Sequence, residues 1–345
     1  MNVRILILLV FLPYNLLAQS FSGLGSTAEG FANPAPNTNF DFPLDHGPHN
    51  NYRIEWWYLT ANLSGEDQTP YGIQWTLFRT ARSPNGGNGW LSNQIWFAHA
   101  AITTPDEHFT TERFARGGIG QAGVNAEPFE AWIDEWKLVG ENFDELNLNA
   151  AGPNFGYDMS LEAEGPLVFH GEKGYSVKSS EGQASYYYSQ PFFKMKGILT
   201  LPEGDINVEG NAWLDREWSS QPLSENQLGW DWFSLSLDNG AKLMGFQLRQ
   251  TDGLNFSSSS WIEPDGSLTS YGNNEFVAEP VRESNVYDKK IPTEWRLKLK
   301  DQNVDVIVKA LNPNSWMNLS IPYWEGPVAV SGSHSGQGYL EMTGY

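Results

Sequence analysis

Two short stretches concentrate the side chains that could carry chemistry. In "EWWYL", residues 55–59, the carboxyl group of Glu55 precedes two adjacent tryptophans. In "WLDREWSSQPL", the acids Asp215 and Glu217 flank Arg216. A carboxyl group buried among indoles either pairs with a cation or keeps its proton, because the loss of hydration raises its pKa. The two stretches therefore offer an ion pair, a proton donor, or both.

Strand alternation predicts where these side chains point. Successive residues of a strand face opposite sides, so Glu55 and Trp57 share one face, which we expect to point into the core. Asp215 and Glu217 share one face of a later strand, and Arg216 lies on the other. Barrel closure would bring the last strand beside the first. We therefore expect Glu55 and Arg216 within ion-pair reach at one end of the first barrel, with Asp215 or Glu217 close by, as a structural pair or as part of a functional site.

Histidine is sparse, with six residues in the chain. His99 falls in the middle of a predicted strand, where it is either a core residue or a chemical group. His46 and His49 form an H-x-x-H pattern that could bind a metal with Asp45 or His99, but an ordinary loop is the favoured interpretation. We predict no metal site. No G-x-S-x-G, Walker A or H-E-x-x-H pattern occurs, and we predict no cofactor.

The elements that must position these residues are strands. Short aromatic or β-branched runs alternate with Gly, Pro, Asn or Asp, and helical periodicity is scarce, which predicts an all-β protein. The 15 Trp, 14 Tyr and 19 Phe residues supply ample core material. Residues 107–135 fit the pattern least, and we expect a long insertion with one short helix there.

An internal repeat divides the chain. Four stretches match later ones in the same order: "EWWYL" with "DWFSL", "GIQW" with "GFQL", "AAITTPD" with "SSWIEPD", and "GNAWLD" with "GQGYLE". This order predicts two related β-domains in tandem, joined within residues 219–227. The second copy lacks counterparts of His99 and of "REW". We therefore expect the functional site in the first domain.

The N-terminus resembles a leader. "MNVRILILLVFLPYNLLAQS" has an early cation, an apolar run and small residues near Ala18, as in a cleaved secretory signal peptide. We expect a secreted or periplasmic protein. The predicted divisions are a signal peptide at 1–18, an extended lead-in at 19–39, and domains at 40–222 and 223–345.

Composition excludes several classes of partner. The net charge of −20 argues against binding to nucleic acid or to anionic membrane surfaces. The chain has no cysteine, so it has neither disulfides nor a thiol nucleophile. No apolar run after the leader is long enough to span a membrane, and we expect no stable membrane insertion after signal cleavage. The sequence does not set the oligomeric state.

The motifs together resemble a known family. "FPLDHGPHNNYRIEWWYLTANL", "SYYYSQP", "WLDREWSSQPL", "GWDWFSLSLDNG" and "YWEGPVAVSG" are similar to the AttH family of secreted proteins. Members resemble carotenoid 1,2-hydratase and are often labelled predicted secreted hydrolases. The resemblance covers nearly all of the mature chain. It implies two tandem lipocalin-like β-barrel domains and an apolar, polyunsaturated ligand.

The resemblance also implies roles for particular residues. Hydration of an alkene needs a protonated acid, an aromatic wall that stabilises a cation, and a base that holds water. The residues that could transfer protons are Asp215, Glu217, Glu55 and His99. The residues expected to line a ligand site are Trp56, Trp57, Tyr58, Trp75, Trp96, Trp213, Arg216 and Trp218.

Three functions fit these observations. The first is an enzyme that acts by proton transfer on a hydrophobic unsaturated molecule of terpenoid, lipid or polyketide-like type. The second is a non-catalytic periplasmic binder or carrier of a hydrophobic ligand. The third, ranked behind both, is a carbohydrate binder. Catalysis predicts carboxylates that converge on a cavity, simple binding predicts carboxylates held in ion pairs, and carbohydrate binding predicts aromatic residues on an open outer face.

Overall fold

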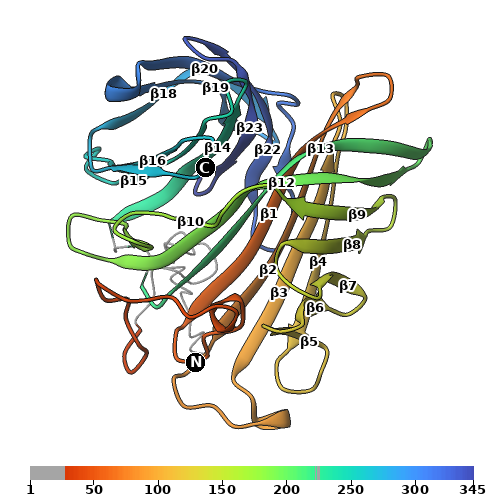
Figure 1. Cartoon of the computed structure of the whole chain (residues 1–345), viewed down its shortest axis with the longest axis vertical. Helices are drawn as coiled ribbons and strands as arrows, with labels where there is room; N and C mark the ends of the chain where they lie inside the picture. Colours follow the sequence, from red (N-terminus) through yellow and green to blue (C-terminus); the bar gives the residue numbers. More distant parts are fainter. Residues whose placement is uncertain (1–27, 222, 224–225) are drawn as a thin grey trace, which may run out of the picture.

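The chain folds into two antiparallel sheets (Figure 1). The structure, a computed structural model, describes residues 28–221, 223 and 226–345. Within these residues the helical elements are three short 3-10 turns: Leu44–His46, Gly89–Leu91 and Lys300–Gln302. The prediction of an all-β protein is therefore confirmed.

The first sheet contains thirteen strands in the described part of the chain. They are β1 (Ile54–Gly65), β2 (Pro70–Ala81), β3 (Gln94–Thr103), β4 (His108–Arg116), β5 (Ala122–Asn125), β6 (Phe129–Ile133), β7 (Trp136–Gly140), β8 (Glu145–Ala151), β9 (Gly156–Ala163), β10 (Val168–Phe169), β11 (Tyr175–Val177), β12 (Ala184–Leu201) and β13 (Gly204–Ser219). β1 pairs with β2 on one side and with the last strand, β13, on the other. The sheet curls around one core cluster that includes Trp57, Trp75 and Trp136.

The second sheet contains ten strands in the same described residues. They are β14 (Gln227–Leu237), β15 (Lys242–Gln250), β16 (Phe256–Ile262), β17 (Leu268–Tyr271), β18 (Phe276–Val286), β19 (Lys289–Leu299), β20 (Val304–Ala310), β21 (Trp316–Met317), β22 (Tyr323–Gly332) and β23 (Gly336–Met342). β14 pairs with β15 and with the last strand, β23. This sheet encloses a separate core cluster, which includes Phe233, Trp295 and Trp324.

The two sheets repeat one plan, that of tandem lipocalin-like barrels. In each, the first strand lies between the second and the last, so "EWWYL" on β1 and "DWFSL" on β14 occupy equivalent strands, as predicted. The match of "GIQW" with "GFQL" does not hold in register. Gly72 lies opposite Asn62, far along β1, whereas Gly245 lies opposite Phe233, two residues after Asp231.

Residues 107–135 differ from expectation. Instead of an insertion with a helix, they contain β4, β5 and β6, which belong to the first sheet. In β6, "FEAWI", Phe129, Ala131 and Ile133 are buried and the residues between them are partly exposed. This is the period of two that marks a half-buried strand, and Gly and Asn residues nearby obscure it in the sequence.

The connection between the sheets runs from Ser219 to Gln227. The predicted division between residues 222 and 223 falls in this connection, and residue 222 is outside the described residues. The predicted signal peptide and residues 19–27 of the lead-in also lie outside them. Residues 28–39 contain no regular strand. Among the described residues, no helix has the length and apolar character needed to cross a membrane.

The two barrels pack directly against each other. A third cluster of buried side chains joins them, with Ile54 and Tyr187 from the first sheet and Trp232 and Phe246 from the second. On another part of this interface the backbones approach so closely that a Cβ atom added to Gly72 would lie 2.6 Å from the ring of Pro327. The outer face of each first strand is therefore buried between the domains.

Candidate functional site

The two faces of β1 have different surroundings. Trp57 and Leu59 point into the core of the first barrel, and Glu55 shares that face with them. Trp56 and Tyr58 point the other way and pack in the cluster between the domains. This confirms the predicted alternation.

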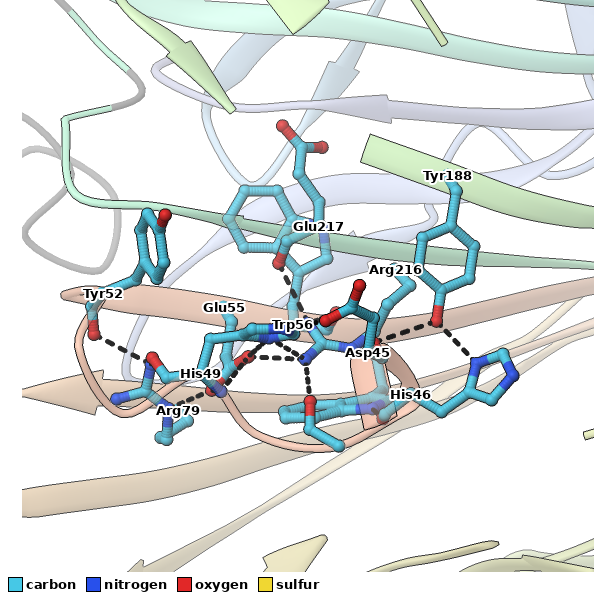
Figure 2. A network of polar contacts seen from close by, with 12 residues as sticks. Asp45, His46, His49, Tyr52, Glu55, Trp56, Arg79, Tyr188, Arg216 and Glu217 are labelled. Atoms are coloured by element: carbon cyan, nitrogen blue, oxygen red, sulfur yellow. Dashed lines mark hydrogen bonds and ion pairs between the residues drawn. The ribbon is translucent and has the colours of Figure 1, made fainter. Parts of the chain in front are cut away.

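Inside the first barrel, Glu55 is the centre of an ion-pair network (Figure 2). Its side chain is fully buried, with Arg216 Nη2 2.5 Å from Oε2 and Arg79 Nε bonded to Oε1. The backbone N–H of His49 donates to both carboxylate oxygens, at 2.9 and 3.1 Å. Burial alone would raise the pKa of Glu55, but the two guanidinium groups and the His49 bonds hold it well below its usual range. The predicted pair of Glu55 and Arg216 is confirmed.

Aromatic rings and a backbone carbonyl fix the position of the Arg216 guanidinium group. Its guanidinium carbon lies 3.8 Å from the centroid of Trp57 and 5.0 Å from that of Trp218. Its Nη2 also donates to Gly47 O at 2.5 Å. Such a network has the character of a structural clamp, and two guanidinium partners that favour the ionised form make Glu55 a poor proton donor.

The H-x-x-H residues support this clamp rather than a metal. His49 Nε2 bonds Asp45 Oδ1 at 3.0 Å, while His46 Nδ1 bonds the hydroxyl of Tyr188 at 2.7 Å. His46 also stacks on Phe143, and burial lowers its pKa to about 3. Across the described ranges, no group of three or more His, Asp or Glu side chains could hold a metal ion.

On the opposite side of β1 and β13 lies the inter-domain pocket, a cavity of about 80 Å³ that opens to solvent. Both domains contribute to its walls. The lining residues are Ile54, Trp56, Tyr58, Phe78, Lys178, Tyr187, Asp215, Glu217, Leu223, Trp230, Trp232, Phe246, Leu248 and Glu341. Aromatic walls with a few convergent titratable groups are the usual mark of a small-molecule site.

Asp215 is the most deeply buried acid of the first domain in this pocket, at 2% exposed. Trp213 Nε1 donates to its Oδ1 at 2.6 Å, the hydroxyl of Tyr187 donates to Oδ2 at 2.7 Å, and Ser189 also donates to Oδ1. Burial raises the pKa of Asp215 to about 7, in spite of these three donors. Arg216 is on the other face of β13 and does not offset that effect.

Glu341 faces the same pocket from the second domain. Trp230 Nε1 donates to its Oε1 at 2.6 Å, and Tyr58 lies beside it. Burial raises the pKa of Glu341 to about 7, and the negative charges of Asp215 and Glu217 add to the effect. Glu341 was not predicted as a site residue, although the match of "GNAWLD" with "GQGYLE" pairs Asp215 with Glu341.

Glu217 is paired. Lys178 Nζ lies 2.9 Å from its Oε1, and Ser185 donates to the same oxygen. The Lys178 ammonium also rests 4.4 Å from the centroid of Phe246. Glu217 points away from the Glu55 network (Figure 2). It therefore contributes polarity and shape to the pocket wall rather than a free acid.

His99 differs from expectation. It lies on the outer face of the first barrel, where its Nδ1 bonds the hydroxyl of Tyr323 in the second domain at 2.9 Å. It does not line the pocket. Burial lowers its pKa to about 3, so it is neutral at physiological pH. Tyr323 in turn bonds Glu325, which accepts from Tyr58, so His99 belongs to a buried polar network between the domains.

The predicted ligand-binding residues divide by strand face. Trp56 and Tyr58 line the pocket, and Trp213 contacts it through its bond to Asp215. The others are packed inside the first barrel and touch no part of the pocket: Trp57, Trp75, Trp96, Arg216 and Trp218. The candidate site therefore lies at the junction of the two domains and not inside the first one.

Comparisons with known proteins agree with this architecture. A family model described as AttH-like matches residues 33–345. A provisionally named AttH protein from Nitrosomonas europaea has a crystal structure that is 32% identical in sequence, with a TM-score of 0.83. The match covers 91% of this chain and 99% of that one.

More distant structures share the fold. Kievitone hydratase from Nectria haematococca is 14% identical, with a TM-score of 0.67 over 91% of this chain and 98% of that one. CghA, solved with Sch210972, is 10% identical, with a TM-score of 0.52 over 93% and 96%. Comparison with curated proteins returns no match.

Proposed function

We propose that this chain, which belongs to the AttH-like family, binds a hydrophobic unsaturated small molecule in the inter-domain pocket and transfers a proton to it. One observation carries the proposal: the buried carboxyl group of Asp215 and the half-buried one of Glu341 face a single aromatic cavity, and each has a pKa raised to about 7. Two acids that share a site and titrate near neutral pH suit general acid–base chemistry.

The pocket walls favour an apolar ligand. Trp56, Trp230, Trp232 and Phe246 present aromatic surface from three strands. Aromatic faces attract a carbocation that forms beside them, which lowers the barrier to protonation of an alkene. A terpenoid, lipid or polyketide-like molecule with a polarisable double bond would match these walls.

The proposed reaction is the addition of water to a double bond. Protonated Asp215 donates H⁺ to one alkene carbon, and the cation that remains on the other carbon is attacked by water. Ionised Glu341 accepts a proton from that water, so the product is an alcohol. Asp215 regains a proton and Glu341 loses one through solvent at the pocket mouth. The reaction requires a proton on Asp215 and an ionised Glu341, and pKa values of about 7 for both groups make this state accessible near neutral pH.

The solved structures that share this fold support a hydration reaction. Kievitone hydratase is named for a hydration, and we extend that reaction type to this chain as a proposal. The carrier function remains a second candidate, because the Lys178–Glu217 ion pair is the arrangement expected of a purely binding cavity.

The experiment is a screen of terpenoid, phenolic and polyunsaturated fatty alkenes in D₂O, followed by mass spectrometry. We expect a product that has gained one water, with one deuterium on carbon. Asp215→Asn should abolish this product. Asp231→Asn is the matched control, because Asp231 is equally buried but lies outside the pocket. Hydration by Asp215→Asn would contradict the mechanism, and saturable binding without turnover by wild type would favour the carrier.

We also propose export with cleavage near Ala18, on the basis of the leader-like N-terminus. N-terminal sequencing of protein recovered from the exported fraction should begin close to residue 19. An intact Met1 on cytoplasmic protein would contradict this proposal.

A further inference from the structure

A buried histidine that the reaction above does not use lies behind Asp215. His170 follows β10, is fully buried, and bonds on both sides. Its Nε2 is 2.7 Å from Ser189 Oγ, and its Nδ1 is 2.9 Å from Ser260 Oγ. Ser189 bonds Asp215 in turn. An unbroken chain therefore runs from Asp215 through Ser189 and His170 to Ser260 of the second domain.

The direction in which the hydrogen bonds of this series run depends on whether Asp215 is protonated. Trp213 is a donor only, and the Tyr187 hydroxyl accepts from Trp232 Nε1 at 3.1 Å while it donates to Asp215. Among the three groups that bond Asp215, the Ser189 hydroxyl is thus the one that can change from hydrogen-bond donor to acceptor. It donates when Asp215 is ionised and accepts when Asp215 is protonated.

Reversal of Ser189 requires a partner that can also reverse. When Ser189 donates to Asp215, the Nε2–H tautomer of His170 can donate to Ser189 Oγ. When Ser189 accepts a hydrogen bond from protonated Asp215, the Ser189 hydroxyl hydrogen needs an acceptor of its own. That acceptor is Nε2 of His170 in the Nδ1–H tautomer. The Nδ1–H group of His170 then donates to Ser260 Oγ. Neutral imidazole has one donor and one acceptor nitrogen and exists in both forms. Burial and the nearby Lys178 lower the pKa of His170 to about 3, so it stays neutral.

We propose that His170 is a positioning residue that allows Asp215 to hold and release a proton, by turning the Ser189 hydroxyl as its own tautomer changes. This inference rests on the proposed function for the role of Asp215 as the acid. Other titratable and charged groups that face the pair are Tyr187 on β12, Glu217 on β13, Glu341 on β23 and Lys178. None of them touches Ser189 or His170 through a side-chain hydrogen bond in the described residues.

The test is a titration of Asp215 followed by NMR in protein labelled with ¹³C at aspartate carboxyl groups, with the signal assigned by its loss in Asp215→Asn. An E341Q background removes the other acid of the pocket whose pKa is raised to about 7, so that it does not titrate beside Asp215. Ser189→Ala removes a donor to the ionised form and should raise the pKa of Asp215 by roughly one. His170→Phe keeps the ring over Tyr187 but leaves the reversed Ser189 hydrogen without an acceptor. It should lower the pKa by roughly one half.

Two further variants make the test specific. In the double variant S189A/H170F, the His170 change should have no effect, because His170 acts only through Ser189. Ser260→Ala, a small change in the other domain, should also lower the pKa of Asp215, because it removes the acceptor for Nδ1–H. The proposal would be overturned if the pKa of Asp215 were unchanged in both His170→Phe and Ser260→Ala. It would also be overturned if His170→Phe changed this pKa equally in the presence and in the absence of the Ser189 hydroxyl. No substrate is needed, so a failed hydration screen leaves this result intact.

Discussion

At the scale of single residues, the acids of "EWWYL" and "WLDREW" separate into two kinds. Glu55 is ionised and clamped by Arg79 and Arg216, whereas Asp215 is buried without a cation. Alternation along β13 assigned Arg216 to one face and the two acids to the other, but the prediction that Asp215 or Glu217 lies close to Glu55 was wrong, because both acids face the inter-domain pocket. Arg79 was not predicted. Its signal was one arginine in the apolar stretch "IQWTLFRTA", which strand pairing places opposite Glu55.

The first prediction compares two neutral isosteres at these acids. Glu55→Gln leaves two buried guanidinium groups without their carboxylate and should lower the free energy of unfolding by roughly 3–5 kcal/mol at neutral pH. Asp215→Asn removes a carboxyl group whose pKa is raised in the folded state, so it should not lower the free energy of unfolding at neutral pH. Urea denaturation of both variants and wild type is the measurement. Equal stability of all three would refute the structural role of Glu55.

At the scale of elements, the repeat positions a second inward acid. Asp231 on β14 corresponds to Glu55 on β1, and Arg249 of β15 lies 3.3 Å from its carboxylate. This pair is weaker. Burial raises the pKa of Asp231 more than Arg249, Tyr345 and Gln247 lower it, and Arg249 is 17% exposed.

The second prediction follows from that comparison. Asp231→Asn should cost on the order of 1–2 kcal/mol, less than Glu55→Gln, because Arg249 keeps access to solvent and retains its bond to Thr343 O. The same urea experiments give both values. A cost for Asp231→Asn that exceeds that of Glu55→Gln would contradict the ranking of the two clamps.

Element periodicity predicted the strands and the repeat, but not the pocket. The sequence analysis placed the site in the first domain because the second copy lacks "REW" and His99. The matched acids Asp215 and Glu341 instead meet between the domains, each on the last strand of its sheet. The alternation of apolar and polar residues assigns side chains to the two faces of a strand. It does not tell which strands have their outer face covered by the other domain.

At the scale of the whole molecule, the buried titratable groups couple pH to stability in two opposite ways. A carboxyl group whose pKa is raised in the folded state stabilises the fold at low pH, and this contribution is lost as the pH rises from about 4 to about 7. Asp215 and Glu341 are of this kind. Four histidines have pKa values lowered to about 3 and act in the opposite sense below pH 6.5: the buried His46, His99 and His170, and the half-buried His108.

The third prediction uses a matched variant to isolate the carboxyl groups. The double variant D215N/E341Q keeps all four histidines, so its stability relative to wild type reports the two acids together with Glu325, whose pKa the charge of Glu341 raises. Relative to wild type it should gain a few kcal/mol between pH 4.5 and pH 7.5. Urea denaturation at these two pH values is the measurement. A constant difference would show that neither carboxyl group has a raised pKa.

The central claim is that ligand binds between the domains and not inside the first barrel. Photoaffinity labelling with a neutral diazirine-bearing farnesol analogue, followed by peptide mass spectrometry, tests this most directly. We predict adducts on pocket-lining residues such as Trp56, Trp230 and Phe246, which excess unlabelled farnesol should suppress. Adducts on residues of the first barrel's interior, such as Trp75 and Trp96, would contradict the claim.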